Sequence, residues 1–384
     1  MFLDALRRRN PALVEACVHL HQQGRIPPNT VVIDVDTVRE NARHLVETAA
    51  EQGMALYFMT KQFGRDSELS REIAAQGLTR AVAVDLQEAR RLSQAGIRVG
   101  HVGHLVQPGK HEWPQVLQME PEVVTLFSLE RARQLSQAAQ RMGRVQGVML
   151  RVVKEGDRFY PGQRGGFSLA DLHACLPELL DLAGIRVEGV TSFPVAEAAA
   201  GKGGFRWTPN LQTLLEGKAI LEQAGVEVKQ VNGPGMTSCA LLPFLKQRGV
   251  THGEPGHALT GTTPLHAGTQ NLPERPALAY VTEISHRDGE HLYVIGGGFY
   301  SRSRAEGAWV GSTAYAALKC RIAYHPVPPG TIDYYGALQE TEGVQIGDTA
   351  VFCFRTQVFV TRAHLALLYG VGRHPIRIRL LRRG

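Results

Sequence analysis

The chain has 384 residues, 43% of them hydrophobic, which is enough to bury a large core and to form two domains. Five arginines near the C-terminus account for most of the net charge of +6, so the body is nearly neutral and no nucleic-acid partner is expected. No apolar run reaches transmembrane length and no signal sequence opens the chain, so we expect a cytoplasmic protein without a membrane partner. The cysteines are widely spaced, which suits a reducing compartment and predicts no metal site.

Residues 1–30 are predicted to form a helical extension, with a helix over residues 11–23 and a turn at Pro27 and Pro28. A strand is expected next, over residues 31–35. Asp36 is then expected to cap a helix over residues 38–52.

From residue 55 onward, short apolar runs alternate with amphipathic helical stretches. Eight runs are predicted as strands: 55–60, 81–84, 98–103, 123–127, 145–153, 187–193, 226–232 and 250–253. The clearest helices are expected over 86–94, 129–141, 169–183 and 211–224. This alternation predicts a parallel α/β fold, and eight units favour a (β/α)8 barrel over residues 31–260, with a doubly wound open sheet as the alternative.

After residue 261 the pattern changes to short alternating strands separated by Gly and Pro. It predicts a C-terminal antiparallel β domain over residues 261–384. The expected strands cover 279–284, 291–296, 316–324, 349–354 and 358–361.

A barrel places its chemistry at the C-terminal ends of its strands. Six polar residues stand at or soon after these ends: Lys61, His104, Arg164, Ser192, Asn232 and Glu254. Burial lowers the pKa of a lysine and leaves a neutral amine that attacks carbonyls. Most lysines at strand ends reach into solvent instead, and this is the better interpretation of Lys61 taken alone. Together the groups are those that a cofactor with a phosphate and an aldehyde would need.

Two short motifs near the end of the barrel strengthen this interpretation. In NGPGMTS, residues 232–238, small residues allow backbone N–H groups to converge on an anion, and Thr237 or Ser238 is expected to open a short helix. A plain Gly/Pro turn is the alternative. In GEPG, residues 253–256, Glu254 is placed to hydrogen-bond a pyridine nitrogen, against the alternative of a solvated loop glutamate.

These residues together resemble the fold-type III pyridoxal-phosphate enzymes, the superfamily of alanine racemase and ornithine decarboxylase. The layout, with its N-terminal extension, resembles the YhfX-like predicted amino-acid racemases in particular, and the resemblance covers about residues 30–360. It implies that Lys61 is the Schiff-base lysine, that Glu254 pairs with the pyridine nitrogen, and that Arg164, in RGGF, supports the cofactor phenolate and the substrate carboxylate. It also implies a phosphate loop whose contacts are Asn232, Gly233, Gly235, Met236 and Thr237.

The sequence departs from the superfamily at several positions. SFPV has Pro194 where decarboxylases stack a histidine on the ring, so Ser192 must support the cofactor differently. Where racemases carry a catalytic tyrosine, this chain has a glycine, and the nearest phenol is Tyr300. Gln357 stands where decarboxylases have a second-domain catalytic side chain, and Arg355 is a candidate for binding a substrate anion.

The resemblance implies a reaction at Cα of an amino acid through an external aldimine and a quinonoid. Racemisation is favoured, a decarboxylase or lyase is the alternative, and a non-catalytic pyridoxal-phosphate carrier is the third possibility. The C-terminal domain argues against the carrier. A homodimer is also implied, in which Tyr300 and Arg355 complete the site of the partner chain. His101 and His104 are expected to make local hydrogen bonds and to bind no metal.

Overall fold

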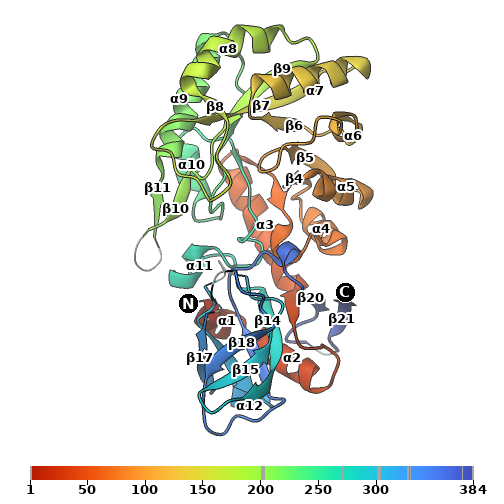
Figure 1. The fold of residues 1–384 in the computed structure, drawn as a ribbon, viewed down its shortest axis with the longest axis vertical. Helices are drawn as coiled ribbons and strands as arrows, with labels where there is room; N and C mark the ends of the chain where they lie inside the picture. The colour runs from red at the N-terminus through yellow and green to blue at the C-terminus, as the bar shows by residue number, and fades with distance from the viewer. Residues whose placement is uncertain are drawn as a thin grey trace. The chain divides into compact units, whose positions relative to one another are not determined.

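The structure is a computed structural model, which describes residues 2–199, 204–269, 271–300, 304–326, 328, 330–373 and 375–382 (Figure 1). The chain divides into two compact units. The barrel unit comprises Ala42–Thr60 and Ser70–Gly256, and the sheet unit comprises Met1–Asn41, Lys61–Leu69 and His257–Gly384. Within the described residues, no helix is both long enough and apolar enough to span a membrane.

The barrel unit is built on a parallel sheet that closes on itself, so the predicted (β/α)8 barrel is confirmed and the open sheet is wrong. The first strand is split at Tyr57: its first half pairs with the last strand and its second half with the next one. Hydrogen bonds from Tyr57 N to Gly253 O and from Met59 N to Pro255 O extend this closure. Around the barrel the strands are β2 (Ala55–Leu56) with β3 (Phe58–Met59), β4 (Arg80–Ala83), β5 (Arg98–Val102), β6 (Val123–Leu126), β7 (Gln146–Val153), β9 (Ile185–Thr191), β12 (Gln230–Asn232) and β13 (His252–Gly253).

Helices alternate with these strands along the chain. They are α3 (Val35–Glu51), α4 (Ser67–Ala74), α5 (Leu86–Gln94), α6 (Trp113–Gln118), α7 (Leu129–Arg141), α8 (Leu169–Asp181), α9 (Pro209–Gln223) and α10 (Leu242–Gln247). Several of them begin at a side-chain cap: Asp85, Ser128 and Ser168, for example, accept a backbone N–H of the first turn. The helix expected to open at Thr237 or Ser238 begins instead at Leu242, because a turn at Ser238 comes first.

Apolar side chains at alternate strand positions fill the inside of the barrel. Tyr57, Met59, Val82, Val123 and Met149 form one buried cluster. Because residues two apart on a strand face the same side, the next inward position on β6 is residue 125 and the next on β7 is residue 151. Both of these positions carry polar side chains, Thr and Arg, near the C-terminal end of their strands.

The sheet unit contains a nine-stranded, mainly antiparallel sheet, as predicted for the C-terminal part of the chain. Its order is β15 (His291–Ile295), β18 (Tyr335–Gln339), β17 (Arg321–His325), β16 (Gly307–Gly311), β19 (Thr349–Phe352), β14 (Leu278–Arg287), β1 (Thr30–Asp34), β20 (His364–Tyr369) and β21 (Arg377–Leu381). Two expected strands differ: residues 316–324 begin in the helix α12 (Ala314–Ala317), and residues 358–361 form the 3-10 helix η2 (Val358–Val360).

The N-terminal segment is part of the core of this unit. β1 pairs antiparallel with β14 and parallel with β20. The helices α1 (Phe2–Arg9) and α2 (Pro11–Gln22) share one buried cluster with the sheet, through residues such as Leu6, Cys17 and Trp309. The N-terminal residues therefore form a hydrophobic core with the C-terminal strands, and α2 has nearly the expected limits.

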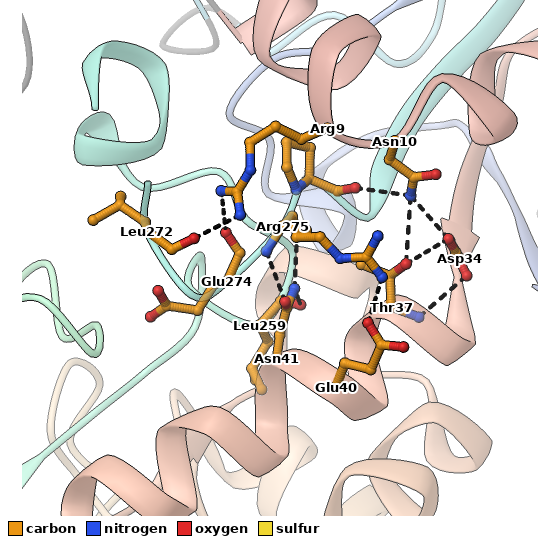
Figure 2. Close-up of polar contacts among 11 residues, drawn as sticks. Arg9, Asn10, Asp34, Thr37, Glu40, Asn41, Leu259, Leu272, Glu274 and Arg275 are labelled. Carbon is orange, nitrogen blue, oxygen red and sulfur yellow. Dashed lines mark hydrogen bonds and ion pairs between the residues drawn. The ribbon is translucent and has the colours of Figure 1, made fainter. Parts of the chain in front are cut away.

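Buried polar contacts hold the N-terminal helices in place (Figure 2). The Asn10 side-chain amide donates to Asp34 Oδ2 at 2.9 Å and to the carbonyl of Pro276 at 3.0 Å. Asp34 also accepts the backbone N–H of Thr37 at 3.2 Å, so Asp34, and not the expected Asp36, caps the start of α3. Arg9 donates to the carbonyls of Leu272 and Glu274.

Candidate active site

Glu254 is the centre of a buried polar network at the C-terminal end of the barrel strands. It directly follows β13, and its side chain is 1% exposed. Its Oε1 atom accepts hydrogen bonds from Asn232 Nδ2 at 2.7 Å and His101 Nδ1 at 2.8 Å, while its backbone N–H donates to Thr237 Oγ1 at 3.1 Å. The alternative of a solvated loop glutamate is therefore wrong.

The network keeps Glu254 ionised. Burial acts to raise the pKa of its carboxyl group, but the charge of His104 and the hydrogen bond from His101 outweigh burial and bring the pKa to about 2. His104 Nε2 lies 3.4 Å from the second oxygen, Oε2. That oxygen is buried and accepts no hydrogen bond from the described residues. One oxygen of a buried carboxylate thus remains available to a donor.

The same cluster has the composition of a metal site. His101, His104 and Glu254 bring three donor atoms within 4.8 Å of one another. Both ring nitrogens of His101 already have partners, however, because Nε2 lies 2.6 Å from Thr125 Oγ1. We therefore describe the cluster as a hydrogen-bonded network, and the absence of a metal site stays a prediction.

The loop over residues 232–238 packs closely against its neighbours. Gly235 has φ of +129°, and a Cβ atom there would lie 3.1 Å from the Ala196 carbonyl oxygen, so only glycine fits. A Cβ atom on Gly233 would lie 3.0 Å from Val250, and Met236 has φ of 56°. Two buried atoms of the loop, Asn232 Oδ1 and Ser238 Oγ, have no hydrogen-bond partner among the described residues. Together with Glu254 Oε2, these atoms fit a polar ligand that is bound at this end of the barrel.

Ser192 and Phe193 follow β9 and line the same end of the barrel unit. Ser192 is buried and lies 3.4 Å from Asn210 Nδ2. The Phe193 ring stands edge-on to His104, with centroids 5.3 Å apart, and lies 5.5 Å from Tyr160. The peptide bond from Phe193 to Pro194 is cis. Aromatic rings therefore pack on Phe193, the residue directly before Pro194, which stands in the place of the decarboxylase histidine.

Arg151 is a buried arginine that sequence reasoning missed. Only 1% of it is exposed, and it donates to the carbonyls of Gln163 at 2.7 Å and His104 at 3.4 Å. Its guanidinium lies 4.7 Å from the centre of the Phe127 ring, and it pairs with no carboxylate among the described residues. Burial lowers the pKa of Arg151 to about 10. A buried arginine without an acidic partner is rare, which makes this side chain a candidate for binding a ligand anion.

Arg164, the arginine expected in this role, is exposed, and its guanidinium lies 5.4 Å from the Phe159 ring. The glycines of RGGF instead bring the loop close to β7. Gly166 has φ of +136°, and a Cβ atom there would lie 2.6 Å from the Arg151 carbonyl oxygen. The motif therefore helps to enclose Arg151.

The other predicted site residues belong to the sheet unit. Lys61 directly follows the barrel unit in the chain; it is half-buried and opens the 3-10 helix η1 (Lys61–Phe63). Burial, followed by the positive charges of Arg355 and Lys61, holds the pKa of His257 well below its usual value. His257 Nδ1 lies 3.1 Å from Thr262 Oγ1. His257 is therefore a buried, neutral imidazole that is influenced by the charges of Lys61 and Arg355. It was missed, although it stands three residues after Glu254.

The side chains of Tyr300 and Gln357 make no hydrogen bond with the residues that the structure describes. Tyr300 is half-buried and makes no hydrogen bond with the part of the chain that the structure describes. Gln357 precedes η2 and its side chain does not cap that helix. Their roles stay predictions.

Comparisons with known proteins agree with this architecture. Residues 33–264 match the family model "Alanine racemase, N-terminal domain", and residues 279–378 match "YhfX-like, C-terminal domain". The chain is 42% identical over 374 residues to the protein YhfX of Escherichia coli (strain K12), covering 97% of this chain and 95% of that protein.

Solved structures of similar fold are distant in sequence. Alanine racemase from Clostridium difficile 630 has a TM-score of 0.63 at 14% identity, over 91% of this chain and 98% of that one. D-threonine aldolase from Filomicrobium marinum has a TM-score of 0.62 at 14% identity, over 92% and 94%. D-threo-3-hydroxyaspartate dehydratase from Delftia sp. HT23 has a TM-score of 0.63 at 17% identity, over 93% and 97%.

Proposed function

The chain belongs to the alanine racemase N-terminal domain family, and from this membership we propose that it is a pyridoxal-phosphate-dependent enzyme that acts at Cα of an amino acid. The observation that supports the proposal most directly is the state of Glu254. It is a buried, ionised carboxylate whose Oε2 accepts no hydrogen bond from the described residues. Such an oxygen suits the N–H of a protonated pyridine ring.

Each group of residues has a role in the proposal. Lys61 Nζ would hold the cofactor aldehyde, and the loop with Gly233, Gly235, Met236 and Thr237 would hold its phosphate. Ser192 and Asn232 would contact the cofactor from neighbouring strand ends. When bound, the cofactor supplies an electron sink that stabilises negative charge at Cα.

Racemisation is the reaction we propose first. Lys61 Nζ, once neutral, would take the proton from Cα, and Tyr300 would return a proton on the opposite side. Arg151, in place of the exposed Arg164, would bind an anionic group of the substrate, and Arg355 and Gln357 are further candidates for this role.

A lyase reaction is the second candidate, because the structural neighbours include an aldolase and a dehydratase. It would use the same Lys61 and Glu254. An aldolase would break the Cα–Cβ bond, after which Cα takes up a proton, whereas a dehydratase would remove the Cα proton and then expel the hydroxyl group on Cβ as water.

We also propose a homodimer, in which Tyr300 and Arg355 of one chain complete the site of the other. Such an arrangement would supply Tyr300 as the second proton donor.

The first test of the proposal is covalent labelling. Purified protein is incubated with pyridoxal phosphate, reduced with borohydride and digested, and the peptides are analysed by mass spectrometry. The pyridoxyl group is expected on Lys61, and Lys61→Ala should lose it while the exposed Lys110→Ala keeps it. A wild-type protein without label on Lys61 would overturn the proposal.

The second test identifies the reaction. The loaded enzyme is incubated with each amino acid in deuterated water, and Cα exchange, chirality, carbon dioxide and keto-acid or aldehyde products are followed together. Exchange with loss of chirality supports a racemase, side-chain cleavage supports the lyase, and carbon dioxide release supports a decarboxylase. Labelling without any exchange would leave the carrier.

A further inference from the structure

His101 lies between two neighbours of the barrel interior, and its side chain is fully buried. Nδ1 lies 2.8 Å from Glu254 Oε1, and Nε2 lies 2.6 Å from Thr125 Oγ1. The three residues come from β5, from β6 and from the end of β13. A continuous chain of hydrogen bonds therefore crosses this end of the barrel.

The donors along this chain follow from the chemistry of its ends. An ionised carboxylate only accepts hydrogen bonds, so His101 Nδ1 must carry the proton and donate it to Glu254. The Thr125 hydroxyl then donates its hydrogen bond to Nε2, which favours this tautomer of the ring. Asn232 Nδ2 donates to the same oxygen at 2.7 Å. Both donors therefore act on Oε1, and Oε2, which faces His104, is the oxygen left for a ligand.

We propose that His101 is a positioning residue that keeps Glu254 ionised and holds its Oε2 toward the pyridine nitrogen of the cofactor, with Thr125 fixing the His101 ring. This inference rests on the proposed function. His101 does not need to touch the cofactor, because it acts through Glu254.

The reason for such a residue is the cost of burying a charge. An isolated carboxylate in an apolar interior takes up a proton and becomes neutral. A neutral Glu254 would donate its own hydrogen to the pyridine nitrogen, which would then stay unprotonated and withdraw electrons less strongly. Together with the charge of His104, the hydrogen bond from His101 opposes this exchange of roles, since a carboxylate accepts such a bond more strongly than a neutral carboxyl group does.

The two hydrogen bonds of His101 distinguish its positioning role from a role as a metal ligand. Ligation of a metal by His101 Nδ1 would require the loss of its bond to Glu254, and Nε2 is engaged by Thr125. In a hydrogen-bonded network, an amide nitrogen at the place of Nδ1 can replace the imidazole. Asparagine has its side-chain amide nitrogen at that place, and phenylalanine keeps the size of the ring without any donor.

The experiment uses pyridoxal phosphate labelled with ¹⁵N in the ring, bound to wild type, His101→Phe and His101→Asn. The ¹⁵N chemical shift reports whether the pyridine nitrogen is protonated, independently of turnover. We expect a protonated nitrogen in wild type and His101→Asn, and a shift toward the unprotonated value in His101→Phe. The dissociation constant of the cofactor should rise roughly 10- to 100-fold in His101→Phe, as when residues that support a bound group are removed.

Thr125→Val serves as a second variant, because it removes one hydroxyl at nearly constant volume and so keeps the test possible if His101→Phe fails to fold. It should move the ¹⁵N shift in the same direction by a smaller amount. Loaded His101→Phe with the wild-type shift would overturn the inference, and so would an unchanged Thr125→Val if His101→Phe does not fold. A wild type that binds no cofactor at Lys61 would instead overturn the proposed function, so the two failures are distinguishable.

Discussion

Asn232 Nδ2 donates a hydrogen bond to Glu254 Oε1 across 2.7 Å, and this bond ties the end of β12 to the end of β13. Both side chains are buried, and 22 positions separate them in the chain. Two adjacent barrel strands thus deliver a carboxylate and its donor to one place. A substitution that keeps the shape of Glu254 and removes its charge can therefore test whether the charge is needed.

Glu254→Gln should slow Cα exchange by on the order of 10²- to 10³-fold, because glutamine keeps the shape of the side chain but cannot balance a protonated pyridine. Borohydride labelling of Lys61 should persist, since the substitution leaves the lysine in place. The measurement is exchange into deuterated water with saturating amino acid. Glu120→Gln, at an exposed side chain, is the control, and equal exchange rates in the two variants would contradict the role of Glu254.

Arg151→Gln should weaken the binding of the amino acid about tenfold, because a buried charge-assisted hydrogen bond is lost. Arg164→Gln should change this binding less than about twofold, since Arg164 is exposed. Binding is measured by titrating the loaded protein with substrate and following its visible absorption. Arg151→Lys, which keeps the charge, should fall between wild type and Arg151→Gln. The opposite ranking of Arg151→Gln and Arg164→Gln would return the anion-binding role to Arg164.

Mixed dimers of Lys61→Ala and Arg355→Ala should have about half of the wild-type activity, and the unseparated mixture about a quarter, although each variant alone is inactive. Random pairing makes half of the dimers mixed, and each mixed dimer has one intact site if Arg355 acts on the partner chain. The two variants are co-expressed with different tags, and the mixed dimer is isolated by sequential affinity steps. An inactive mixed dimer would show that both residues act in the site of the same chain. Light scattering that gives the mass of one chain would contradict the proposed dimer.

The free energy of unfolding should fall as the pH is lowered from 6.5 toward 4, partly through His252. Burial lowers the pKa of His252 from 6.5 to about 4, and the ring stacks on Tyr57 with centroids 5.5 Å apart. The folded state therefore keeps His252 neutral, while the unfolded state binds a proton below about pH 6.5, so acid favours unfolding.

His252 alone should remove about 2 kcal/mol of stability between about pH 8 and pH 5, with little further loss below its folded pKa. Urea unfolding at these two pH values measures the effect. His252→Gln should have a shallower dependence on pH by this amount, and His111→Gln, at an exposed position, should match wild type. Parallel pH profiles for wild type and His252→Gln would contradict the prediction.

The sequence by itself determined the barrel and the kinds of polar side chain that stand at the ends of its strands. Apolar runs that alternate with amphipathic helices are local patterns, and each strand needs only its own residues to be recognised. Lys61 and Glu254 could be selected for the same reason, since each follows a run whose end is visible in the sequence. The C-terminal sheet was predicted only in part: strands such as β16 and β20 were missed, and η2 was taken for a strand.

Only the tertiary structure decided which polar side chains are buried and which partners they have. Thr125, His101 and Glu254 lie on different strands, and their hydrogen bonds depend on the order and register in which the barrel strands pair. Burial likewise separates Arg151 from Arg164, because two glycines at positive φ bring a loop onto one arginine and leave the other exposed. β1 joins β14 and β20 for the same physical reason: a strand's pairing partner is chosen by hydrogen bonds and packing with distant segments, which the local pattern of side chains does not encode.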